Sequence, residues 1–165
     1  MDHYNQPPNP PSPPIIAIAG WLVPGLGYAL IGERARALIV GTTIVAIFIL
    51  GLLIAGVRCI DVPGYDANGE LRQIGRNQTL IGSAPLAAIR DKPWYIPQIL
   101  AGPLTIGASV WSVSASAGAA KATGRLWDIG TLYTAVAGML NLLVIIDAAY
   151  RSAKIREDNP RLGPM

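Results

Sequence analysis

The fold is decided by residues 37–57, ALIVGTTIVAIFILGLLIAGV, a run of 21 residues without a charged side chain. A helix rises about 1.5 Å per residue, so this run is long enough to cross the hydrocarbon core of a bilayer, which is about 30 Å thick. A charged side chain at the bilayer centre costs at least about 2.5–3.5 kcal/mol. A charge-free run of this length therefore predicts a membrane-spanning helix.

Three more apolar runs accompany this one, at residues 15–32, 96–120 and about 129–150. Together they predict an all-α integral membrane protein, a four-helix transmembrane bundle built as two helical hairpins. The first run contains Pro24, Gly25 and Gly27. Because proline removes a helix hydrogen bond and glycine loosens the backbone, this run either crosses the bilayer or re-enters on the side it left. Both alternatives stay open at this point.

The remaining segments are short and polar. Residues 1–14 include PPNPPSPP and predict a disordered, proline-rich tail. The loop at residues 58–95 is too short to build a hydrophobic core of its own. Residues 151–165 form a basic C-terminal tail. The chain is therefore expected to contain a single membrane domain at residues 15–150.

The distribution of lysine and arginine predicts an orientation. The loop at 58–95 and the C-terminal tail carry nine of these residues, whereas the two other connections carry four. Two of those four belong to a compact hairpin tip formed by Glu33, Arg34 and Arg36. Because cytoplasmic loops are enriched in Lys and Arg, both termini and the middle loop are predicted to be cytoplasmic.

Composition excludes several functions. The chain has one cysteine and one histidine, so neither an internal disulfide nor a His/Cys metal site is expected, and no cofactor is expected. The net charge of +3 comes mostly from loop residues, which gives no support to nucleic-acid binding. The expected partners are the lipid bilayer and either another membrane protein or further copies of the chain.

Two polar side chains inside the fourth run are candidate site residues. Asn141 is expected to form hydrogen bonds between helices, and Asp147 to form an ion pair beside Arg151 near the bilayer surface. Ser109 lies in the segment GASV, which is similar to the serine motif of rhomboid proteases. That chemistry needs a histidine in a neighbouring helix, and none of the runs contains one. The chain is therefore not expected to be an enzyme.

Two segments resemble known families. Residues 20–41, GWLVPGLGYALIGERARALIVG, resemble the two-transmembrane-helix domain through their PGxG bend and basic hairpin. These residues and 127–143, WDIGTLYTAVAGMLNLL, are similar to an uncharacterised membrane family of planctomycete-type bacteria, domain of unknown function 6677. The resemblance covers roughly residues 15–150 and implies a shared fold with no assigned activity.

Two functions remain open after these considerations. The leading hypothesis is a structural or interaction protein of the membrane, acting as a subunit, assembly factor or scaffold. The alternative is an accessory component of a transporter or lipid-handling system, in which the Pro24 bend and Asp147 line a polar cavity.

Overall fold

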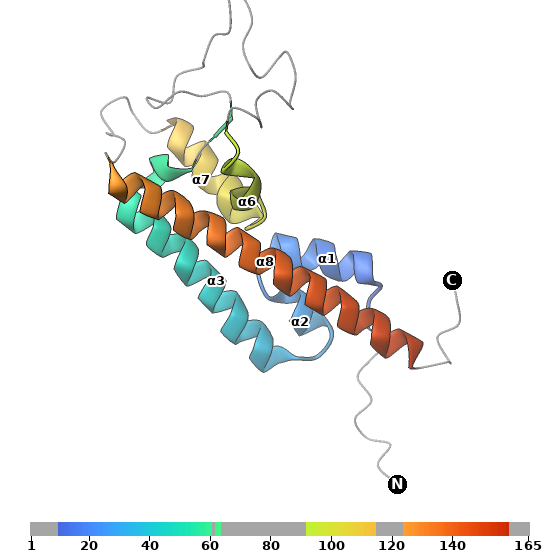
Figure 1. Cartoon of the computed structure of the whole chain (residues 1–165). Coiled ribbons are helices and arrows are strands. Elements are labelled where there is room, and N and C mark those ends of the chain that lie inside the picture. Colours follow the sequence, from blue (N-terminus) through green and yellow to red (C-terminus); the bar gives the residue numbers. More distant parts are fainter. Residues whose placement is uncertain (1–9, 61, 64–91, 115–123, 159–165) are drawn as a thin grey trace, which may run out of the picture.

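The computed structural model describes residues 10–60, 62–63, 92–114 and 124–158, and within these ranges every regular element is a helix. Two long helices form the frame: α3 (Arg34–Ala55) has 22 residues and α8 (Arg125–Glu157) has 33. They lie side by side and run in opposite directions (Figure 1). The predicted all-helical class is confirmed, and both helices have the length and apolar composition needed to cross a membrane.

Small residues bring α3 and α8 together at one end. A Cβ atom added at Gly51 would lie 2.8 Å from Thr134 Cγ2 and 2.9 Å from the carbonyl oxygen of Gly130. Any larger side chain here would push the two backbones apart. Close helix approach through small residues is the usual way in which helices pack inside membranes, where there is no hydrophobic force to join them.

The first apolar run is broken into two short helices, α1 (Pro13–Leu22) and α2 (Leu26–Leu30). Between them Gly25 has φ +88°, a backbone conformation that glycine adopts without strain. The chain turns back at this point, because both ends of the segment lie beside the C-terminal part of α8. Ser152 Oγ donates a hydrogen bond to Pro11 O at 2.7 Å, and Tyr28 OH donates one to Asp147 Oδ2 at 2.7 Å. The first run thus turns back on itself and is not one continuous helix.

The third apolar run is also broken, into α6 (Tyr95–Ile99) and α7 (Pro103–Ser114). Gly102 in the break has φ +73°, and Pro103 begins α7 with the fixed φ that suits a first helical position. Ser109 Oγ lies 3.5 Å from Tyr95 OH, which shows that α7 folds back along α6. This second broken hairpin lies against the N-terminal half of α8, whereas α1 and α2 lie against its C-terminal half (Figure 1).

The arrangement therefore differs from four crossing helices. In a four-span bundle the hairpin tip and the end of the last span lie on opposite sides, yet Arg151 Nη1 lies 3.4 Å from Glu33 Oε1. The tip and the C-terminal end of α8 share one end of the molecule because α1 and α2 are too short to cross it. Part of the expected basic tail is helical, since α8 continues to Glu157. Residues 1–9, 64–91 and 159–165 lie outside the described ranges.

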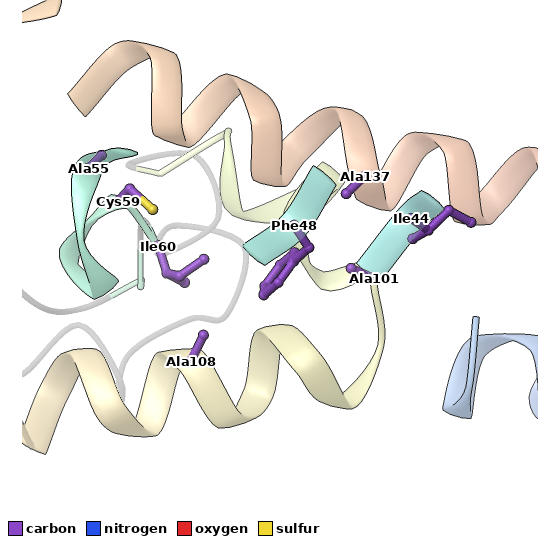
Figure 2. Packing of buried hydrophobic residues seen from close by; sticks show 8 residues of the cluster. All are labelled: Ile44, Phe48, Ala55, Cys59, Ile60, Ala101, Ala108 and Ala137. Carbon is purple, nitrogen blue, oxygen red and sulfur yellow. The ribbon is translucent and has the colours of Figure 1, made fainter. Parts of the chain in front are cut away.

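The core lies between the C-terminal half of α3, the short 3₁₀ helix η1 (Val57–Cys59), the second broken hairpin and α8. Phe48 lies in the middle of the cluster and Ile44 at one end of it, with small residues of the neighbouring segments around them (Figure 2). The whole cluster consists of Ile44, Phe48, Ala55, Cys59, Ile60, Ala101, Ala108 and Ala137. Because many of these side chains are small, the backbones of four elements approach one another closely.

Candidate functional site

Asn141 occupies the place where the two broken hairpins meet. It is 0% exposed, and its Nδ2 donates hydrogen bonds to Leu100 O at 2.9 Å and to Gly20 O at 3.3 Å. Those two carbonyls come from the second and the first hairpin respectively. A direct bond joins the hairpins beside it, from Trp21 Nε1 to Ile99 O at 3.1 Å. We call these five residues the Asn141 junction.

The junction supplies hydrogen bonds that the broken helices lack. In an unbroken helix the donor for Gly20 O would be the residue four positions on, which here is Pro24 and has no N–H. Leu100 lies in the break between α6 and α7, so the residue four positions on, Leu104, belongs to the next helix. A buried carbonyl without a donor costs roughly 1–3 kcal/mol. The side-chain amide of Asn141 therefore compensates for both breaks.

The chemistry of the junction is neutral. Its side chains are an amide, an indole and aliphatic groups, and none of them can act as an acid or a base near neutral pH. Asn141 Oδ1 is buried too, and it accepts no hydrogen bond from the residues that the structure describes. The junction can thus position two backbone segments and offer one further acceptor atom, but it holds no group for proton transfer.

A network of charged groups joins the hairpin tip to α8. Asp147 Oδ2 accepts hydrogen bonds from Tyr28 OH at 2.7 Å and from Arg151 Nε at 2.6 Å. Glu33 pairs with Arg36 at 2.5 Å and with Arg151 at 3.4 Å. The Arg36 guanidinium also lies 5.6 Å from the centre of the Tyr28 ring, a cation–π distance. We call these residues the tip network.

The tip network holds its own charges in balance. Two carboxylates, Asp147 and Glu33, face two guanidinium groups, and each carboxylate has at least one cationic partner. The Asp147 and Arg151 side chains are 41% and 39% exposed, so solvent screens the pair. The arrangement suits a clamp that holds α2 and the start of α3 against α8.

The other sequence-selected residues have packing roles or stand apart. Pro24 and Gly25 form the break between α1 and α2, and a side chain at Gly25 would collide with Ala37 O of α3. Gly27 lets α2 approach α8, because an added Cβ would lie 3.1 Å from Ala148 Cβ. Arg34 is exposed and makes no ion pair with any described residue. Pro24, Gly25 and Gly27 thus hold the first broken hairpin close to α3 and α8, whereas Arg34 stands apart from the junction and the tip network.

A third polar cluster lies beside η1. Gln98 is 0% exposed and donates from Nε2 to Cys59 O at 3.0 Å and to Thr134 Oγ1 at 2.8 Å. Thr131 Oγ1 donates to the same Cys59 carbonyl at 3.0 Å. Burial raises the pKa of the Cys59 thiol to about 12, so the thiol stays neutral and is a poor nucleophile. Within the described ranges no three His, Cys, Asp or Glu residues are grouped as metal ligands would be.

Sequence reasoning missed several residues of these clusters, among them Trp21, Gln98 and Tyr28. Trp21 looked like one more apolar residue of the first run, and its indole N–H had no visible partner. Gln98 carried a signal, because it is a long polar side chain inside a charge-free run, where polar groups usually bond across helices. Tyr28 carried a similar signal, because its hydroxyl is a polar group inside the first apolar run.

Comparison with known proteins supports the family and adds no activity. No curated protein and no solved structure matches this chain. The model of a family of unknown function, DUF6677, matches residues 15–160. The matched range includes both broken hairpins, α3 and α8 as far as Glu157. This chain therefore belongs to the family of unknown function DUF6677.

Proposed function

We propose that the chain is a multi-pass protein of the bacterial cytoplasmic membrane and serves there as a structural or interaction subunit without catalytic activity. In this proposal α3 and α8 cross the bilayer, and the two broken hairpins enter from opposite ends without crossing. The observation that carries it is the reversed polarity of the fold, with amides and hydroxyls inside and large apolar side chains outside.

The reversed polarity is clear from individual residues. Leu53 and Leu38 on α3 are 75% and 69% exposed, and Leu143 on α8 is 63% exposed. Asn141 and Gln98, by contrast, are fully buried. Soluble proteins seldom expose a continuous apolar face of this size, whereas lipid tails cover it at no cost. The buried amides each bond to backbone carbonyls, as polar groups inside a membrane protein must.

The orientation proposed is that both termini and the hairpin tip face the cytoplasm. Of the described basic residues, five lie at the tip end of the molecule and three at the other end; counted over the whole sequence, the connections on the two sides carry six and seven, so the labelling experiment below decides the orientation. The five are Arg34, Arg36, Arg151, Lys154 and Arg156, and the three are Arg58, Lys92 and Arg125. The segment between α3 and α6 then begins and ends on the opposite side, which replaces the cytoplasmic middle loop expected from the sequence.

Embedding and orientation are tested together by cysteine labelling in intact cells. Single cysteines are placed at Lys154 and at Leu143 in a Cys59→Ser background. We expect a membrane-impermeant maleimide to label Lys154→Cys only after the cells are opened, and to leave Leu143→Cys unlabelled in both cases. Labelling of Leu143→Cys in folded protein would refute embedding. Labelling of Lys154→Cys in intact cells would refute the orientation alone.

The interaction role rests on what is left unused. The charges of the tip network pair within the chain, and the junction is neutral. The polar groups of these two clusters therefore bond to one another and to the backbone of the same chain. Among the described residues, much of α3 makes no contact within the chain, since only 22% of its most apolar 18-residue stretch is buried. Helices that expose small and apolar residues in this way pack against helices of other chains.

Photo-crosslinking tests the interaction role directly. A photoreactive amino acid is placed at Leu53 on α3 or, as the matched control, at Leu143 on α8, and the membranes are irradiated. We expect Leu53 to give one discrete protein adduct, either a second copy or a partner identified by mass. If both positions give only lipid adducts at equal yield, the interaction role is wrong.

A second candidate is an accessory component of a transporter or lipid-handling system. The meeting of two broken helices at a buried amide favours it, because transporters often bind substrates where helices are interrupted. Asp147→Asn discriminates the two, since a folded variant that loses a substrate-dependent phenotype would favour the transport role. A planctomycete-type source and the likeness to the two-transmembrane-helix domain stay predictions from the sequence.

A further inference from the structure

An apolar groove runs along the outer side of α3 beside the Pro24 bend. Its volume is about 410 Å³, and its lining comes from the bend and from one face of the helix. The lining residues are Pro24, Ala37, Leu38, Gly41, Thr42, Val45, Ala46 and Ile49. On α3 they extend over thirteen residues, from Ala37 to Ile49, which is a rise of about 18 Å at about 1.5 Å per residue. That length is close to the depth of one leaflet of a bilayer whose core is about 30 Å thick.

The groove exists because its floor is made of backbone and small side chains. Gly41 is pressed against the bend, since an added Cβ would lie 2.5 Å from Pro24 O. Thr42 offers no free donor, because its hydroxyl donates back to Leu38 O at 2.7 Å. The groove therefore suits a narrow apolar ligand that forms no hydrogen bonds with it.

A cationic group stands at the head of this groove. Arg34 precedes Leu38 by four positions and Gly41 by seven, so all three lie on one face of α3. Neighbouring guanidinium groups are engaged, Arg36 by Glu33 and Arg151 by Asp147. Arg34 has no such partner among the residues described, and its side chain is exposed where the helix begins.

We propose that the groove binds one anionic phospholipid, with an acyl chain along Leu38 to Ile49 and its phosphate at Arg34. The inference rests on the proposed membrane embedding and adds a specific partner to it. Charge complementarity selects this occupant, since an anionic headgroup near a membrane-surface Arg gains about 1 kcal/mol. A second copy related by a two-fold axis along the bilayer normal would instead bring two Arg34 side chains together, and like charges repel.

The test uses full-length protein incorporated into liposomes of equal phosphatidylglycerol and phosphatidylcholine with matched chains. The protein is extracted in mild detergent, and retained lipids are counted by native mass spectrometry. Arg34→Gln removes the cation and Ala46→Leu fills the groove. The matched controls are Lys154→Gln, an exposed cation on α8 at the same end, and Ala35→Leu, an exposed alanine of α3 outside the groove.

We expect the wild type to retain one phosphatidylglycerol per chain with about fivefold preference over phosphatidylcholine. Arg34→Gln should lose the preference, Ala46→Leu should lose the retained lipid, and both controls should match the wild type. The inference is overturned by equal retention of the two lipids, by loss of preference in Lys154→Gln, or by a lipid-free dimer. Alkaline carbonate extraction of the same membranes separates the causes, because a chain that is extracted refutes embedding itself.

Discussion

Replacing Asn141 by leucine tests whether the junction holds the two broken hairpins together. The substitution removes the donor for Gly20 O and Leu100 O while filling a similar volume. Interhelical hydrogen bonds in membrane proteins average about 0.6 kcal/mol, so two give a lower bound of about 1.2 kcal/mol. Two buried carbonyls left without donors set an upper bound of about 6 kcal/mol. Since the leucine side chain gains about 1 kcal/mol of apolar burial, we expect a loss of about 2–3 kcal/mol.

The assay is reversible unfolding in mixed micelles with rising dodecyl sulfate, followed by tryptophan fluorescence. Trp21 reports on the junction because its indole N–H bonds to Ile99 O across the hairpins. The matched control is Leu143→Ala, two positions further along α8 and 63% exposed, where we expect a change below about 0.5 kcal/mol. If Asn141→Leu unfolds at the same detergent fraction as the wild type, the two bonds do not stabilise the fold.

Three further predictions follow from packing, burial and charge. Gly130→Ala should destabilise by about 1–3 kcal/mol, because its Cβ would meet the α3 backbone, whereas Gly107→Ala, whose Cβ meets nothing within 4 Å, should be neutral or stabilise by about 0.5–1 kcal/mol in the same unfolding assay. Cys59 should resist maleimide at pH 8 until the protein is unfolded. Its folded pKa of about 12 lies above the ordinary 9.0, so the unfolded chain loses the proton first and the unfolding free energy should fall as pH rises above about 9. Tyr28→Phe removes one hydrogen bond to the half-exposed Asp147 carboxylate and should cost about 0.5–1.5 kcal/mol; an unchanged midpoint would show that the tip network clamps nothing.

The two long helices were predictable because their signal is local. A long apolar run identifies a candidate span without any knowledge of its neighbours, and residues 37–57 and about 129–150 correspond to α3 and to the middle of α8. The ends were less certain. α8 begins at Arg125 and continues to Glu157, because charged residues are good helix formers once a helix has started.

The break at Pro24-Gly25 was noted in the sequence, whereas the break at Gly102-Pro103 was missed and residues 96–120 were expected to form one span. Pro24-Gly25 and Gly102-Pro103 both contain residues that interrupt helices. Whether the chain goes on in the same direction or turns back depends on contacts between segments far apart in sequence, such as Trp21 with Ile99. No local pattern records those contacts, and the count of crossing helices depended on them.

The candidate site shows the same division. Asn141 and Asp147 could be selected because a polar group in an apolar run needs a partner. The partners of Asn141 are backbone carbonyls, which every residue possesses, so the sequence did not distinguish Gly20 and Leu100 from their neighbours. Asp147 is joined to Tyr28 from a segment 119 positions away in addition to nearby Arg151.

One face of α8 receives both broken hairpins. The second hairpin contacts it through Gln98 at Thr134, and the two hairpins share Asn141. The buried residues of this face are spaced by alternating steps of four and three: Thr134, Gly138, Asn141, Ile145, Ala148 and Ser152. Such spacing keeps side chains on one stripe of a helix. The two hairpins lie against opposite halves of α8, and both bond to this stripe. A shift of α8 along its axis would therefore move one hairpin toward the middle of the molecule and the other away from it. Substitutions on the stripe should therefore affect both hairpins together, whereas those on the outer face of α3 should leave them in place.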